Sequence, residues 1–342
     1  MPKSAAKAPR NELAKHTEKV VKEVLKTTGF VPEKEIYRNY DNSKLDYQIR
    51  SLILKGVFGK TPAVLKFHGL KNESQDVEEI EKFNGQNESD LISAPTVLSH
   101  RAWVSSKGYG YTIFGYVDAP PIIRSAFPSK EELSDFLRFY QEYKTRAITR
   151  PWIKTPRGQD FSSAYRETAD LWIRKAKAKE RLAERDYIPY YKTLMKLGDA
   201  QISQIPAEFM HMHLYPEHIL KLDGGKYLLL DHFSWGYRRQ WADLSYMFWK
   251  TMVGIRDNEF TGADLFDYFK AWRLKLKEIP VVKKDRNFDR KIGLLVLERT
   301  IGTIIGDIGS GKFWETTEGQ SYFKAALRRE QDFFELLSED YK

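Results

Sequence analysis

The sequence predicts an α+β fold in two lobes, a smaller strand-rich lobe followed by a larger helical one. Short apolar runs of strand type fill the first part of the chain, whereas helical periodicity dominates from Ser129 onward. The segment Tyr116–Pro121 separates the two patterns. We therefore expect a flexible basic arm at 1–17, an N-terminal lobe at 18–117 and a helical C-terminal lobe at 118–342.

The smaller lobe shows strand pairs on either side of one helix. The stretch IRSLILKGVFGKTPAVLKFHG contains two apolar runs separated by Gly59–Pro62, which is typical of a hairpin. In NESQDVEEIEKFNGQ, apolar side chains recur at helical spacing at Val77, Ile80 and Phe83. APTVLSHRAWVSSKGYGYTIFGYV then returns to two strands with a turn at Ser-Ser-Lys-Gly. The predicted order is two strands, a helix and two strands.

The larger lobe is predicted to be mainly helical. Ser129 and Glu132 form a capping box at the start of its first helix. Further helices are predicted by apolar periodicity over 162–186, 263–277, 288–308 and 321–337. KYLLLDHF, which contains Asp231, is the strand signal that we find in this half.

Composition excludes several classes of protein. The chain has no cysteine, so disulfides, thiolate metal sites and cysteine nucleophiles are excluded. No stretch approaches the roughly 18 apolar residues that would span a membrane, and we expect a cytoplasmic protein without membrane partners. The formal charge of +9 favours anionic partners such as nucleotides or phosphorylated metabolites.

Lys66 is the first candidate for chemistry, because it ends the apolar run PAVLK just ahead of an acidic helix. In kinase-type phosphoryl transfer, a strand lysine contacts the nucleotide phosphates and a carboxylate on the next helix holds it in place. Glu79 is the helical carboxylate that we expect to take this role. A solvated surface lysine is the alternative interpretation.

Two later segments carry a resemblance to a known family. FMHMHLYPEHIL and KYLLLDHFSWGYRRQWADLSYMFW resemble the catalytic segment of the aminoglycoside phosphotransferase and choline-kinase-like family, whose pattern is H-G-D-x-x-x-x-N-I/V-L, a strand ending in Asp, and D-L-A. With PAVLK, the glutamate helix and the hinge-like IFGYV in the expected order, the resemblance covers about 18–310. It implies a protein-kinase-like fold with a nucleotide-binding N-terminal lobe.

The resemblance also implies roles for individual residues. His211 matches the histidine of the motif, and Asp243 begins the D-L-A-like segment. His213 falls at the catalytic aspartate, His218 at the metal-binding asparagine, and Asp231 at the metal-binding aspartate. The catalytic candidates are therefore His213 and Asp231, and the metal candidates are Asp231 and His218. We expect Lys66 and Asp231 to converge in a cleft between the lobes.

The histidines change what the family motif can do. An unperturbed imidazole has a pKa of about 6.5 and can accept a proton, but His213 gives no fixed negative charge. Mg²⁺ prefers oxygen ligands, so a site with a nitrogen from His218 would bind Mg²⁺ weakly or use Mn²⁺ instead. A Zn²⁺, Fe²⁺ or Mn²⁺ site of His213, His218 and Asp231 stays open. So does a purely structural role for the histidines, as hydrogen-bond partners of backbone carbonyls.

The phosphate-binding loop also departs from the usual chemistry. YRNYDNSKLDYQ, expected between the first two strands, has no glycine, and its polar residues Asn42 and Ser43 are the candidates for contact with the nucleotide. GDIGSGKF nearly fits the P-loop pattern, but Phe313 replaces the Mg²⁺-binding hydroxyl, and we interpret it as a helix end and loop.

Three functions remain open from the sequence. The first is an ATP-binding kinase-like phosphotransferase that uses a divalent cation and a hydroxyl-bearing, small-molecule acceptor. The second is a pseudokinase that binds nucleotide or acts as a scaffold. The third is a nucleic-acid-associated protein that binds RNA through the basic face Arg174–Lys192 and the N-terminal arm. If that basic face borders the site, it argues against a polycationic acceptor such as an aminoglycoside.

Overall fold

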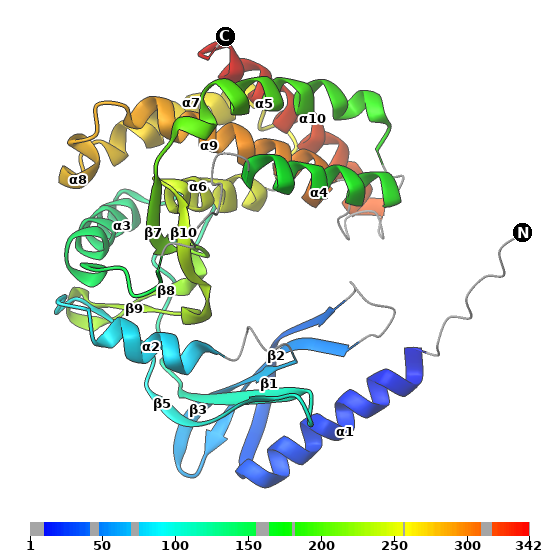
Figure 1. Ribbon diagram of the computed structural model, residues 1–342, viewed down its shortest axis with the longest axis vertical. Helices are drawn as coiled ribbons and strands as arrows, with labels where there is room; N and C mark the ends of the chain where they lie inside the picture. The colour runs from blue at the N-terminus through cyan, green and yellow to red at the C-terminus, as the bar shows by residue number, and fades with distance from the viewer. Residues whose placement is uncertain are drawn as a thin grey trace, which may run out of the picture. The chain divides into compact units, whose positions relative to one another are not determined.

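The computed structural model describes residues 10–41, 48–69, 75–154, 164–179, 182–255, 257–308 and 317–341. The chain divides into two compact units. The first unit comprises Met1–Pro120 and Leu222–Phe233, and the second comprises Pro121–Lys221 and Ser234–Lys342. The first is built around a β-sheet and the second is mainly helical, which confirms the predicted α+β, two-lobed fold class (Figure 1).

A five-stranded antiparallel sheet forms the first unit, in the order β1-β2-β3-β6-β5. Its strands are β1 (Phe30–Asp41), β2 (Gln48–Phe58), β3 (Thr61–His68), β5 (Val97–Val104) and β6 (Tyr109–Gly115). The hairpin predicted around Gly59 is confirmed: Phe58 pairs with Thr61, so only Gly59 and Lys60 form the turn. Gly59 has φ +63, a conformation that glycine adopts at little cost.

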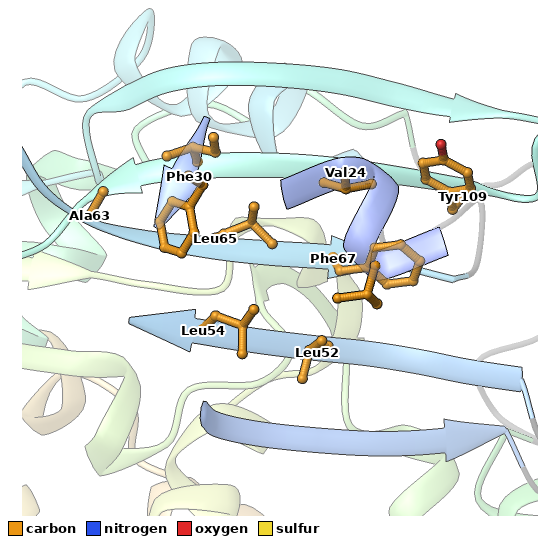
Figure 2. Close-up of a cluster of buried hydrophobic side chains, with 10 residues drawn as sticks. Val24, Phe30, Leu52, Leu54, Ala63, Leu65, Phe67 and Tyr109 are labelled. Carbon is orange, nitrogen blue, oxygen red and sulfur yellow. The ribbon is translucent and has the colours of Figure 1, made fainter. Parts of the chain in front are cut away.

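One face of this sheet is covered by α1 (Arg10–Thr28). Val24 of the helix belongs to one buried cluster with alternate residues of β3, namely Ala63, Leu65 and Phe67 (Figure 2). Because neighbouring side chains of a strand point to opposite faces, Lys66 lies on the other face of the sheet. The hydrophobic contact with α1 therefore fixes which way Lys66 points.

Two predictions for this unit are corrected. Helix α1 begins at Arg10, so the part of the expected flexible arm from residue 10 onward is helical. The sheet also has a third strand before the helix, since β1 includes Tyr37–Asp41, which were expected in a loop. Residues 31–37 of this edge strand are exposed, so their side chains give no alternating apolar pattern for a sequence-based prediction to detect.

The helix α2 (Asp76–Asn84) is confirmed, with its three predicted apolar residues Val77, Ile80 and Phe83 buried. After it, the short strand β4 (Ile92–Ser93) pairs in parallel with β9 (Tyr227–Leu229). This pairing brings the segment Leu222–Phe233 into the first unit, although it lies more than a hundred residues further along the chain.

The second unit contains most of the helices. They are α3 (Lys130–Glu142), α4 (Ala164–Lys179), α5 (Ile188–Ala200), α6 (Ala242–Gly254), α7 (Gly262–Leu276), α8 (Pro280–Lys283), α9 (Phe288–Gly302) and α10 (Thr317–Glu339). The predicted capping box at Ser129 and Glu132 is present at the start of α3. Helix α9 is buried on nearly all sides and packs against α4, α5, α6 and α10, so it forms the centre of this unit.

Some elements of this unit were not predicted. The helix expected over 162–186 ends at Lys179, and α5 follows as a separate helix. Two short strands, β7 (Ala207–His211) and β10 (Trp235–Arg239), pair antiparallel where no pair was expected. The helix expected over 288–308 changes to a π-helical turn at Thr303–Ile308. In the described part of the chain, no helix combines the length and apolar character needed to cross a bilayer.

Candidate functional site

A buried ionic cluster in the first unit is centred on Lys66. Its ammonium donates hydrogen bonds to Asp76 Oδ2 at 2.8 Å and to Asp231 Oδ1 at 3.0 Å. The side chains of Lys66, Asp76 and Asp231 are only 10%, 3% and 17% exposed. We call these three residues the Lys66 cluster.

Three separate segments supply the Lys66 cluster. Lys66 lies in β3, between Ile53 of β2 and Thr112 of β6. Asp76 is the first residue of α2, and its second oxygen, Oδ1, accepts the Phe233 backbone N–H at 2.9 Å. The Phe233 ring also lies 4.6 Å from the Lys66 ammonium. Asp76 therefore holds both the lysine and the segment that follows Asp231.

Asp231 follows β9 with φ 64, in the left-handed region. Aspartate is one of the few residues other than glycine that adopt this conformation, and it persists where surrounding contacts hold it. Here the contacts are the bond from Lys66 to the Asp231 carboxylate and the bond from Phe233 to Asp76. Lys66 and Asp231 converge as expected, but both belong to the first unit, because Asp231 is part of Leu222–Phe233.

The helical carboxylate bonded to Lys66 is Asp76, which corrects the expected role of Glu79. Glu79 lies three residues further along α2 and forms an ion pair with Lys82 at 2.9 Å. The acidic run of α2 indicated the helix, but not which of its carboxylates points toward β3. Asn42 and Ser43, the other two predicted nucleotide contacts, lie outside the described residues.

The ammonium and the carboxylates of the Lys66 cluster stabilise one another in their ionised forms. Burial by itself lowers the pKa of Lys66, but the carboxylates of Asp76 and Asp231 outweigh burial and hold the pKa above its usual value. Burial raises the pKa of Asp76, Lys66 opposes this rise, and the charge of Asp231 adds to it. With all three groups ionised, two carboxylates surround one ammonium, so the cluster attracts a further cation.

Two buried histidines frame the Lys66 cluster. His68, two residues after Lys66 on β3, hydrogen-bonds through Nε2 to the Thr112 hydroxyl at 3.1 Å. His232 donates its Nε2–H to the Leu229 carbonyl at 2.8 Å and packs edge-on against Phe83. Burial lowers the pKa of His68 to about 3 and that of His232 to about 4. Both imidazoles are therefore neutral at physiological pH.

The histidines of FMHMHLYPEHIL lie in the second unit, and each has a defined hydrogen bond. The backbone N–H of the buried His211 donates to the Tyr143 hydroxyl at 2.7 Å. His218 Nδ1 lies 2.8 Å from the His213 carbonyl, and since a carbonyl only accepts, Nδ1 carries the proton. His213 Nδ1 lies 3.0 Å from the Ser234 hydroxyl.

These contacts limit the ways in which the histidines can bind a metal. A protonated Nδ1 cannot be a ligand, so Nε2 is the nitrogen that His218 could offer to a metal. Among the residues that the structure describes, no group of three or more His, Asp or Glu side chains is arranged to hold an ion. The contact of His218 with the His213 carbonyl is the loop-shaping bond that the sequence left open as an alternative.

The sequence-based site missed two residues. Asp76 stands ahead of the three glutamates of α2, and its hydrogen bonds with Lys66 and the Phe233 N–H are what distinguish it. Ser234 follows Asp231 by three positions and has no counterpart in the family motif. Only the pairing of β7 with β10, which brings Ser234 next to the His213 loop, reveals it.

Comparison with solved structures places this geometry in a known fold. Aminoglycoside phosphotransferase APH(4)-Ia matches at 12% identity with a TM-score of 0.55, over 91% of this chain and 98% of its own. The amicoumacin kinase hAmiN matches at 11% identity and 0.54, over 94% and 96%. The chain has the fold of the aminoglycoside phosphotransferases and choline kinases.

The phosphotransferase fold is shared with choline kinase from Cryptosporidium parvum Iowa II, at 11% identity, a TM-score of 0.52 and coverage of 93% and 97%. No protein-family model and no curated protein matches the sequence. The sequence motifs thus identified correctly a fold that overall sequence similarity does not reveal.

Removing Asp76 is expected to destabilise the protein strongly. Asp76→Ala leaves the buried Lys66 ammonium with one carboxylate and frees the Phe233 N–H, which we expect to cost about 3–5 kcal/mol of unfolding free energy. Urea unfolding measures this cost. The control, Glu78→Ala, removes an exposed acid of the same helix and should change stability by less than about 0.5 kcal/mol. Equal losses in the two variants would contradict the structural role of Asp76.

The two buried histidines make stability depend on pH. In the unfolded chain a histidine titrates near 6.5, so the unfolded state binds more protons than the native state below that pH. The stability that neutral His68 and His232 contribute is complete above pH 6.5 and is lost as pH falls toward about 4. We expect a His68→Gln, His232→Gln variant to lose less unfolding free energy than the wild type between about pH 7.5 and about pH 5.

Proposed function

We propose that the protein is an ATP-dependent phosphotransferase that moves the γ-phosphoryl group of ATP to a hydroxyl of a small-molecule acceptor. The observation that carries the proposal is the Lys66 cluster, in which a buried ammonium is held between two carboxylates. A lysine fixed in this way is the part of kinase-type machinery that receives nucleotide phosphates. The fold supports it, since solved structures with this fold include APH(4)-Ia with ADP and hygromycin B, and hAmiN with AMP-PNP and Ca²⁺.

The roles within the Lys66 cluster follow from its geometry. An ammonium has three N–H donors, and two hydrogen bonds to carboxylates leave one for a phosphate oxygen. Asp231 is the more exposed of the two carboxylates and is the one that we assign to a divalent cation, Mg²⁺ or Mn²⁺. Mg²⁺ in phosphoryl-transfer sites is commonly held by one or two carboxylates together with substrate phosphates and water. A cation of this kind would neutralise charge on the phosphoryl group during transfer.

His213 is the group that we assign to accept the proton of the acceptor. When the hydroxyl oxygen attacks the γ-phosphorus, the bond from that phosphorus to the β,γ-bridging oxygen breaks, ADP leaves, and the hydroxyl proton passes to His213 Nε2. Nε2 can accept only if the ring proton sits on Nδ1, and Nδ1 lies 3.0 Å from the Ser234 oxygen. Ser234, buried within the second unit, accepts the Nδ1–H in this tautomer. Ser234 is therefore a positioning residue for the proposed base.

Nucleotide binding tests the first part of the proposal. We expect ATP with Mg²⁺ or Mn²⁺ to raise the unfolding temperature, because a ligand at about 100 times its Kd adds about 2.7 kcal/mol of stability. Lys66→Ala should lose this response, whereas Lys82→Ala, which removes a surface lysine of α2, should keep it. Titration with a fluorescent ATP analogue checks the same point without unfolding.

A wild type that no nucleotide stabilises would contradict the proposal. Binding without turnover on any acceptor would favour the second candidate, a pseudokinase that binds nucleotide. The observation that favours this candidate is the presence of imidazoles at positions 213 and 218, because neither supplies the charge or the oxygen ligand that the family motif has there.

Replacing Ser234 tests the role of His213. We expect Ser234→Ala to lower kcat by about 10- to 100-fold with little change in the KM for ATP, because the Nδ1–H then loses its acceptor and the other tautomer gains population. Ser234→Thr keeps the hydroxyl and should restore most of the rate. The acidic limb of the pH–rate profile should move in the alanine variant only. An unchanged profile together with a lowered unfolding temperature would indicate a packing role instead.

A further inference from the structure

Beside His213 in the second unit lies a group of aromatic rings that the proposed chemistry does not use. The His213 ring stacks on Tyr215 with centroids 5.7 Å apart and planes 12° apart. Tyr215 in turn contacts Tyr246 and Trp249 of α6, at 5.8 Å in each case. We call Tyr215, Tyr246 and Trp249 the aromatic cluster. It places several apolar rings, tilted against one another, next to the proposed base.

Cationic groups surround the aromatic cluster. The guanidinium of Arg299 lies 4.4 Å from the centre of the Tyr246 ring and 5.2 Å from the ring of Trp172. The guanidinium of Arg238 lies 5.1 Å from the Tyr246 ring and donates a hydrogen bond to the Tyr246 hydroxyl at 2.7 Å. Two arginines thus converge on one tyrosine.

The elements that carry these groups pack on one another. Arg238 lies in β10, four residues after Ser234, and Tyr246 lies in α6. Arg299 lies near the end of α9, which packs against both α6 and α4, the helix that bears Trp172 (Figure 1). The Trp249 indole N–H donates to the Thr303 hydroxyl at 2.7 Å, just beyond α9. Arg238 and Arg299 are therefore held in place by elements that pack on one another.

Arg238 differs from neighbouring cations of the unit, which have acidic partners. Lys250, 5.6 Å from the Tyr215 ring, forms an ion pair with Glu217 at 2.5 Å. Arg239, the neighbour of Arg238, has Glu298 at 3.9 Å. Within the described parts of the chain, no carboxylate lies within 4.0 Å of the Arg238 guanidinium. A half-buried cation without an acid is costly, and an anionic ligand would offset that cost.

The same arrangement disfavours cationic acceptors. Ammonium ligands are commonly recognised by the faces of aromatic rings, but the ring of Tyr246 already has two guanidinium groups over it. A polycation or a quaternary ammonium brought to this surface would meet like charge in a poorly solvated setting. Arginine forks match carboxylate and phosphate groups with paired hydrogen bonds.

We propose that the acceptor of the phosphotransferase is a hydroxyl compound that carries a carboxylate or phosphate group. That group binds Arg238 and Arg299, and an apolar part of the molecule lies on the aromatic cluster. This inference rests on the proposed function, because it assigns the substrate class of the same site. It separates the protein from relatives with the same fold that act on aminoglycosides.

A matched set of small probes tests the inference. 4-(Hydroxymethyl)benzoate, 4-(hydroxymethyl)phenyl phosphate, 4-methylbenzyl alcohol and 4-(hydroxymethyl)benzylamine each have one ring and one hydroxymethyl group, and differ in charge. At constant ionic strength, we expect the two anionic probes to raise the unfolding temperature and the neutral and cationic probes to leave it unchanged. Comparison of the two anionic probes distinguishes carboxylate from phosphate recognition. Turnover of each probe with ATP is measured in parallel.

Variants identify the residues that bind the anion. Arg238→Gln and Arg299→Gln should each weaken binding of the preferred anionic probe by at least about 10-fold, since each removes a charged hydrogen-bond donor. Arg238→Lys should recover part of the affinity. Lys250→Gln is the control, because the charge of Lys250 is already paired with Glu217, and it should change affinity by less than about 3-fold.

Preferential binding of the amine, equal binding of all four probes, or unchanged affinity in both arginine variants would overturn the inference. ATP stabilisation of the wild type, measured in the same experiment, keeps the two proposals apart. If ATP stabilises the protein but the anionic probes do not, the acceptor class is wrong and the nucleotide site stands. If the anionic probes bind through the arginines and ATP does not bind, the proposed phosphotransfer fails.

Discussion

The ion pairs of a buried lysine organise the first unit. An ammonium removed from water is tolerated only when opposite charges surround it, and Lys66 has two carboxylates within hydrogen-bond distance. These carboxylates come from segments far apart in the sequence, the start of α2 and the second residue after β9. The ion pairs of the Lys66 ammonium thus hold β3, α2 and the segment Leu222–Phe233 together. Asp76 adds a second link through the Phe233 N–H, which stabilises the left-handed backbone at Asp231.

The second unit contains three imidazoles in a segment whose sequence resembles a catalytic motif. The resemblance assigns His213 and His218 to positions of acid and amide groups, and the structure shows both in hydrogen bonds of the loop. An imidazole differs from a carboxylate because its ability to accept a proton depends on which nitrogen is protonated. The hydroxyl of Ser234 is the neighbour that can set this choice at His213. If His213 is the base, one further residue therefore becomes important.

The sequence predicted the fold class, the β2–β3 hairpin, α2 and the start of α3, because each has a strong local pattern. Gly59 marks the turn, Val77 and Ile80 mark the buried face of α2, and Ser129 caps α3. It did not predict α5, the β7–β10 pair or the third strand of the sheet before α2. Strands of five residues and exposed edge strands have little periodicity, and their pairing depends on contacts that are distant in sequence. Lys66 and Asp231 could be predicted because each lies at the end of an apolar run. Asp76 and Ser234 are recognised only by their contacts with residues distant in the sequence, so they required the structure.

The segment Leu222–Phe233 belongs to the first unit although the chain before and after it belongs to the second, and this has a consequence for biosynthesis. When the first 120 residues have left the ribosome, β4 still lacks its partner β9 and the lysine of the ionic cluster still lacks its second carboxylate. The N-terminal unit can therefore reach its final form only after more than a hundred residues of the other unit have been translated. Completion of the two units is coupled through the order of synthesis, and no single cut in the chain yields both of them intact.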